Sequence, residues 1–105
     1  MYEEVEAGGR EFVLVHAGLG NFSPGKALDD YRLEELILTC PDPGQDCFPD
    51  KYLVFGHTPT PYYTGARLED ARIFRRGRLI AIDCGCVSGG PLGCLCLDTL
   101  EEIYI

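Results

Sequence analysis

Two apolar runs that each end in a histidine constrain the fold of this chain more than any other feature. Residues 12–15, FVLV, lead directly into His16, and residues 52–55, YLVF, lead through Gly56 into His57. Short apolar runs rich in β-branched and aromatic residues predict buried strands, and glycine-containing stretches end them. These are the only histidines in the chain, so we expect both at the same end of adjacent strands, with their rings converging.

Tight turns separate most of the other expected strands. Gly8-Gly9 predicts a hairpin turn, and the basic run Arg75-Arg76-Gly77-Arg78 predicts a second, polar one. The expected strands cover residues 2–6, 11–15, 52–55, 71–74, 79–83, 92–97 and 102–105. With 105 residues, the chain has the size of a single domain or less. The pattern therefore predicts a sheet-dominated α/β unit with mostly antiparallel strands and one or two helices.

One helix and one long loop interrupt the strands. Asp29 and Asp30 open a helix that runs to Ile37, because acidic residues are favoured in a first helical turn. Residues 40–50, CPDPGQDCFPD, contain three prolines and a glycine and cannot continue this helix. A loop of this length is either functional or a solvated connector, and the sequence leaves both alternatives open.

The charge balance argues against nucleic acid as a partner. Nine basic and 17 acidic side chains give a formal charge of −8, and residues 75–78 form the only basic run. An acidic chain can still act on phosphorylated substrates where bound cations offset the repulsion. No stretch approaches the roughly 20 apolar residues of a membrane span, and the N-terminus has no apolar signal core. We expect a cytoplasmic protein without a membrane partner.

Six cysteines include the C-x-C pairs Cys84/Cys86 and Cys94/Cys96. On a strand, this spacing places both thiols of a pair on one face. We expect the cysteines to be reduced and at least partly buried as small hydrophobic residues, with Cys84 and Cys86 facing the same side. A zinc cluster and a set of disulfides remain alternatives.

The strand ends carry the candidate chemistry. A neutral imidazole is a common ligand of divalent transition metals, and the small residues beside His16 and His57 leave space for an ion. A single histidine at a sheet edge is more often a hydrogen-bonded structural residue. Two histidines at equivalent positions, with Asp83 leaving a third strand, favour a shared site.

The ordered motifs resemble a known family. VHAG at 15–18, FGHTP at 55–59, IDCG at 82–85 and Gly89-Gly90 occur in that order, with a helix between the first two. This combination resembles the second half of a calcineurin-like metallophosphoesterase, and within that family the small bacterial serine/threonine-phosphatase type. The resemblance covers essentially the whole chain.

The resemblance implies a two-metal hydrolase whose β-sandwich is flanked by helices and in which a metal-bound hydroxide attacks phosphorus. His16 and His57 match two metal ligands of the family. The two ions of a complete domain are manganese, iron, zinc or nickel. The resemblance also places five residues near the site without making them ligands: Gly18, Gly56, Thr58, Asp83 and Gly85. Asp83 then orients a neighbouring group, or it only caps a turn.

Two departures from the family pattern shape the functional expectation. The GDxHG, GDxxDRG and GNHE motifs, which supply the bridging aspartate, the other ligands and a catalytic histidine, do not occur. Where relatives often have a phosphate-binding arginine, the chain reads Leu38-Thr39-Cys40-Pro41. Arg32 and Arg67 are candidates to replace that arginine.

We therefore expect residues 1–105 to be the C-terminal portion of a longer phosphoesterase, inactive alone and only marginally stable. Its expected partners are the missing half, or other copies through exposed strands, and in the intact parent a phosphorylated substrate. A non-catalytic interaction module and a small zinc protein built on the C-x-C pairs are the alternatives.

Overall fold

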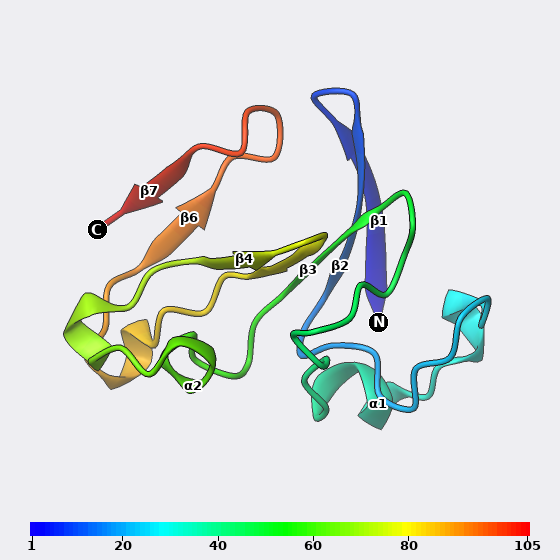
Figure 1. The fold of residues 1–105 in the computed structure, drawn as a ribbon, viewed down its shortest axis with the longest axis horizontal. Helices are drawn as coiled ribbons and strands as arrows, with labels where there is room; N and C mark the ends of the chain where they lie inside the picture. Colours follow the sequence, from blue (N-terminus) through cyan, green and yellow to red (C-terminus); the bar gives the residue numbers. More distant parts are fainter.

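The computed structural model describes all of residues 1–105, as a five-stranded sheet accompanied by a separate two-stranded ribbon (Figure 1). The five-stranded sheet contains β1 (Tyr2–Ala7), β2 (Arg10–Val15), β3 (Tyr52–Phe55), β4 (Phe74–Arg76) and β5 (Leu79–Ala81). The ribbon contains β6 (Gly93–Leu95) and β7 (Glu102–Tyr104). The helices are α1 (Leu33–Ile37) and α2 (Pro61–Thr64), and three 3₁₀ turns are η1 (Leu28–Asp30), η2 (Leu68–Asp70) and η3 (Cys86–Ser88). The expected sheet-dominated α/β class is confirmed.

The order of strands in the large sheet is β1-β2-β3-β5-β4. The hairpins β1-β2 and β4-β5 and the ribbon β6-β7 are antiparallel, so three of the five pairings are of this kind, as expected. The central strands β2, β3 and β5 run parallel to one another. Because they point the same way, the chain leaves all three at the same edge of the sheet.

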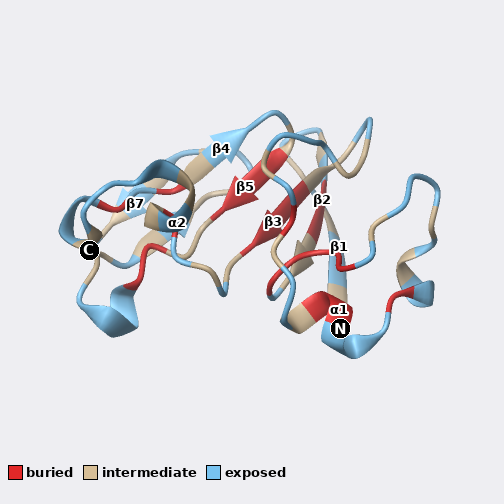
Figure 2. Cartoon of the chain, turned by 60° about the horizontal axis from the view of Figure 1, so that its bottom comes forward, coloured by how far each residue is buried: buried red, intermediate tan, exposed pale blue.

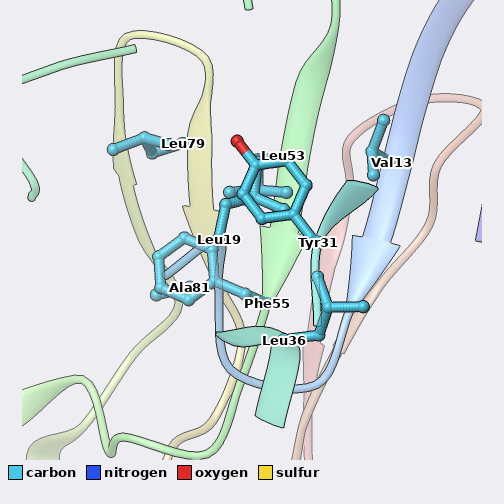
Figure 3. Close-up of a cluster of buried hydrophobic side chains, with 8 residues drawn as sticks. All are labelled: Val13, Leu19, Tyr31, Leu36, Leu53, Phe55, Leu79 and Ala81. Carbon is cyan, nitrogen blue, oxygen red and sulfur yellow. The ribbon is translucent and has the colours of Figure 1, made fainter. Parts of the chain in front are cut away.

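The central strands are buried on both faces (Figure 2). Along β2, β3 and β5 the side chains alternate between two hydrophobic clusters, as the two-residue period of a strand requires. The first cluster (Figure 3) consists of Val13, Leu19, Tyr31, Leu36, Leu53, Phe55, Leu79 and Ala81. The second consists of Phe12, Val54, Ala71, Ile73, Ile80 and Cys84, and Leu95 and Tyr104 of the ribbon pack against it. Burial on both faces explains why these strands read as continuous apolar runs.

The single helix expected from Asp29 to Ile37 is wrong, because the structure divides it into η1 and α1. Tyr31 and Arg32 between them have extended backbones, with ψ angles of 136° and 157°. Tyr31 is buried in the first cluster, so packing of its ring outweighs the helical preference of the segment. None of the helices has the length and apolar character that crossing a bilayer requires.

The loop of residues 40–50 is anchored to the β4-β5 hairpin. Asp46 accepts a hydrogen bond of 2.7 Å at Oδ1 from the backbone N–H of Arg78. A side chain at Gly77, which has a φ of 58°, would overlap this carboxylate, because its Cβ would lie 2.5 Å from Oδ1. The basic run 75–78 is thus the hairpin turn that the sequence predicts.

All six cysteines are free. The expectation that each is at least partly buried is wrong for Cys86 and Cys94, which are exposed, whereas Cys84 is buried. The same-side arrangement of Cys84 and Cys86 fails because β5 ends at Ala81. Gly85 then turns the chain with a φ of 75° and places Cys86 in η3.

Candidate metal centre

The two histidines lie where the parallel strands β2 and β3 end. His16 directly follows the last residue of β2, and His57 is the second residue after β3. The N–H of Gly56 donates to the carbonyl of His16 at 2.8 Å, which extends the pairing of the two strands to the site itself. Carboxyl ends of parallel strands are common positions for ligand sites in α/β sheets. The topology therefore brings together residues that are 41 positions apart.

The two rings converge, as the sequence predicts. His16 Nε2 and His57 Nδ1 are 3.1 Å apart, and the ring centroids are 4.9 Å apart with an interplanar angle of 57°. At this distance one ring nitrogen donates and the other accepts, so the pair shares a single proton. Both residues are exposed, so an ion or a substrate can approach the two nitrogens from solvent.

This separation fits one metal ion. Two nitrogens bound to an ion at about 2.1 Å lie about 3.0 Å apart for an angle of 90° and about 3.4 Å apart for a tetrahedral angle. The observed 3.1 Å between Nε2 and Nδ1 lies within that interval. Binding requires a free lone pair on both nitrogens, which each neutral ring provides when its proton is on its other nitrogen. The distance between the two nitrogens is therefore compatible with binding of a single ion.

His16 and His57 have no third potential metal ligand beside them in this chain. The structure contains no group of three or more histidine, cysteine, aspartate or glutamate side chains placed to hold a metal ion. Two imidazoles occupy at most half of the positions of a four-coordinate ion.

Helix α1 fixes the loop that follows His16. Ala17 N–H donates to the carbonyl of Leu36 at 2.9 Å, and Gly20 N–H donates to the carbonyl of Glu35 at 2.8 Å. These contacts satisfy helix carbonyls that have no partner within so short a helix. Gly18 lies so close to residues 39–41 that a Cβ there would be 2.5 Å from the Thr39 carbonyl oxygen. The glycine of the VHAG motif thus has a packing role beside the site.

Glu35 holds the start of α1, a role that sequence reasoning missed. Its carboxylate accepts hydrogen bonds from the Arg32 N–H at 2.7 Å and from Asn21 Nδ2 at 2.6 Å. Lys26 Nζ lies 3.7 Å from Oε1. The hydrogen bond from the Arg32 backbone, followed by that from Asn21, lowers the pKa of Glu35 from its ordinary value. A glutamate at the third position of a helix indicates this capping arrangement.

His57 has a different backbone from His16. Its φ is 69°, in a region that non-glycine residues rarely adopt. The N–H of Thr58 donates to the carbonyl of Gly56 at 2.8 Å, so residues 56–58 form a three-residue γ-turn around His57. Such turns with positive φ are strained, and strained residues cluster at functional sites.

Asp83 lies beside the histidines, at the third parallel strand end. A Cβ added at Gly56 would lie 3.6 Å from both the Asp83 Cβ and the His16 carbonyl oxygen. The Asp83 carboxylate accepts the N–H of Gly85 at 2.9 Å, and its carbonyl accepts the N–H of Thr60 at 2.8 Å. These contacts match the turn-capping alternative for Asp83. The structure shows Gly85 as the positive-φ residue of that turn.

Tyr63 packs against Phe55 at the end of β3, two residues before His57, a role that sequence reasoning missed. Its ring stacks on Phe74 at 5.3 Å and meets Phe55 edge-on at 6.3 Å. Its hydroxyl is buried without a hydrogen-bond partner. Burial raises the pKa of Tyr63 above its ordinary value, and the neighbouring Cys40 raises it further. Tyr63 thus carries a neutral, buried phenol beside the end of β3.

The phosphate-binding arginine has no replacement at its expected position. Cys40 lines a hollow of about 240 Å³ together with uncharged residues and Asp42. The two candidate replacements are paired with local carboxylates: Arg32 lies 2.8 Å from Glu34, and Arg67 lies 3.3 Å from Glu69. Both arginines are exposed on their own segments.

Comparisons with known proteins add no relative: a scan of family models, a search of curated proteins and a search of solved structures each find no match.

Proposed function

We propose that this chain carries the histidine half of a divalent-metal site in a calcineurin-like metallophosphoesterase. The observation that carries the proposal is the 3.1 Å approach of His16 Nε2 to His57 Nδ1 at the ends of two parallel strands. The motif order VHAG, FGHTP and IDCG supports it as a resemblance.

In this proposal each residue has a separate task. His16 and His57 bind one ion, which is manganese, iron, zinc or nickel. The bound metals supply a nucleophilic water at neutral pH and neutralise the phosphate. Tyr63 packs against the end of the strand that leads to His57, the Asp83 carbonyl accepts the N–H of Thr60 in the loop after His57, and Glu35 holds the helix that positions the loop after His16.

The remaining metal ligands and the phosphate contacts come from a segment outside residues 1–105. Two imidazoles without a bridging carboxylate do not hold a pair of ions, so the chain alone is not expected to hydrolyse phosphoesters. The six free thiols are consistent with a cytoplasmic location, which is part of the proposal. In the assembled enzyme the substrate carries a phosphate group. Because the chain has a formal charge of −8, the proposal includes no nucleic-acid partner.

The zinc-protein alternative finds no support, because no three potential ligands come together. The interaction-module alternative has one specific observation in its favour, an apolar groove beside the free edge of β6.

The test is complementation. The chain is co-expressed with a polypeptide that carries GDxHG, GDxxDRG and GNHE motifs, and p-nitrophenyl phosphate hydrolysis is measured with added Mn²⁺. We expect metal-dependent activity that His57→Ala reduces to background, whereas a control substitution at the fully exposed Val87, Val87→Ala, leaves it unchanged. Activity that survives His57→Ala, or a soluble complex without metal-dependent activity, would contradict the proposal.

A further inference from the structure

An apolar groove of about 320 Å³ lies between the ribbon and the central sheet. Seven of its eight lining residues are hydrophobic, and none is charged. Gly93, Cys94, Leu95 and Leu97 line one side, and Leu14 and Ile82 are among the residues of the sheet opposite. Neither histidine lines this groove, although its lining residue Val15 directly precedes His16.

The groove follows the free edge of β6. Strand β6 pairs with β7 alone. Leu92 and Ile105 exchange both backbone hydrogen bonds, each at 3.0 Å, and Cys96 N–H donates to Glu101 at 2.9 Å. Because antiparallel strands direct alternate residues toward opposite edges, the N–H and C=O groups of Gly93 and Leu95 point away from β7. The ribbon therefore presents a short row of unpaired backbone groups on the side away from β7.

Unpaired strand edges and apolar surface together define what fits the groove. A two-stranded ribbon is only marginally stable, and a third strand both pairs its edge and covers its hydrophobic side chains. Three consecutive residues, Gly93 to Leu95, line the groove, which indicates that the groove runs along the strand edge rather than over one face. An extended peptide placed there donates and accepts backbone hydrogen bonds while its apolar side chains contact the groove.

Acidic residues near the groove define the charge of the occupant. Asp98 directly follows the lining residue Leu97, and Glu3 lines an adjoining hollow that shares Leu14 and Val15 with the groove. Both side chains are exposed and neither carboxylate forms an ion pair, but the Arg10 guanidinium donates to the backbone carbonyl of Asp98 at 3.4 Å, so Glu3 contributes the less compensated charge. A second copy of this chain, with a formal charge of −8, is repelled by this rim. A segment with lysine or arginine on either side of an apolar core is complementary to it.

We propose that this groove binds an extended apolar segment flanked by basic residues, which adds as a strand to β6.

The test uses the 105-residue chain and a synthetic peptide, Lys-Lys-Val-Thr-Val-Thr-Val-Lys-Lys, with a fluorescent label. Binding is followed by fluorescence anisotropy, and backbone amides by hydrogen exchange in NMR spectra. We expect saturable 1:1 binding and at least tenfold slower exchange at the amides of Gly93 and Leu95. A peptide in which glutamates replace the lysines, and a fully N-methylated peptide that cannot form strand hydrogen bonds, should each bind at least tenfold more weakly.

Matched substitutions locate the site. Leu97→Lys places a charge in the groove and should weaken peptide binding at least tenfold, whereas Val87→Lys, at a fully exposed position outside the groove, should not. The proposal fails if the peptide does not bind, if the N-methylated peptide binds equally well, or if protection appears elsewhere in the chain. It also fails if sedimentation shows that the chain pairs with itself through β6, because a second copy then occupies the groove.

Discussion

The two strand ends that present the histidines have the same sequence pattern but are held by different means. After β2, His16 has no positive φ, and the following loop is fixed by hydrogen bonds to the carbonyls of α1. After β3, His57 occupies a γ-turn with a φ of 69°, and Tyr63 packs edge-on against Phe55, the last residue of the strand. The comparison shows that one imidazole is positioned by an unstrained, well-packed backbone and the other by a strained turn.

Replacing one glycine by alanine at each strand end should show this difference most strongly. A Cβ at Gly18 would lie 2.5 Å from the Thr39 carbonyl oxygen, so we expect Gly18→Ala to lower the free energy of unfolding by about 3 kcal/mol. At Gly56 the nearest atoms are 3.6 Å away, so Gly56→Ala should change it by less than about 0.5 kcal/mol. Urea unfolding of both variants provides the measurement. Equal losses would show that the two ends are held alike.

Substitution of the histidines by glycine and by alanine should give opposite orders of stability at the two ends. At position 57 the positive φ favours glycine, so His57→Gly should be more stable than His57→Ala by about 1 kcal/mol. At position 16, where φ is not positive, His16→Gly should be less stable than His16→Ala by about 0.5 to 1 kcal/mol. Thermal and urea unfolding of the four variants would test both orders. The same order at both positions would contradict the inference that the His57 turn is strained.

The pH dependence of stability should report on the support of the His16 end. The folded pKa of Glu35 lies below its ordinary value of 4.5, so its carboxylate stabilises the fold fully above that value. This contribution is lost as the pH falls below 4.5 through the folded pKa. The stability difference between the wild type and Glu35→Gln should therefore shrink on going from pH 7 to pH values below 4.5. A difference that stays constant over this range would exclude the carboxylate as the stabilising group.

Sequence reasoning predicted the histidine pair and most strands because both depend on local patterns, but the strand expected at 71–74 lies at Phe74–Arg76, and those expected at 79–83 and 92–97 are shorter. Runs such as residues 12–15 and 52–55 are apolar throughout only when both faces of a strand are buried, and the two histidines follow them directly. The break between η1 and α1 and the exposure of Cys86 were mispredicted. Both depend on tertiary packing, of Tyr31 in the core and of the turn at Gly85, which no local pattern encodes.

Supporting residues were the hardest to predict. Tyr63 packs against Phe55 at the end of β3 and stacks on Phe74 of the β4-β5 hairpin, and these contacts follow from the tertiary fold rather than from a local pattern. For Asp83 the sequence left open whether it orients a neighbouring group or caps a turn, and its contact with the N–H of Gly85 is of the second kind. Sequence patterns thus located the ends of the strands, but the contacts that hold those ends required the structure.

The most direct test of the central claim is whether His16 and His57 bind one and the same ion. Ni²⁺, which imidazole nitrogen binds well, is titrated into the 105-residue chain, and the ring resonances of both histidines are followed by NMR. We predict that both respond with a common midpoint. His16→Ala and His57→Ala should each weaken binding at least tenfold, and the double variant should bind no more weakly than either single variant, because each loss already removes the shared site. Independent midpoints, additive losses, or wild-type affinity in either single variant would contradict a shared metal centre.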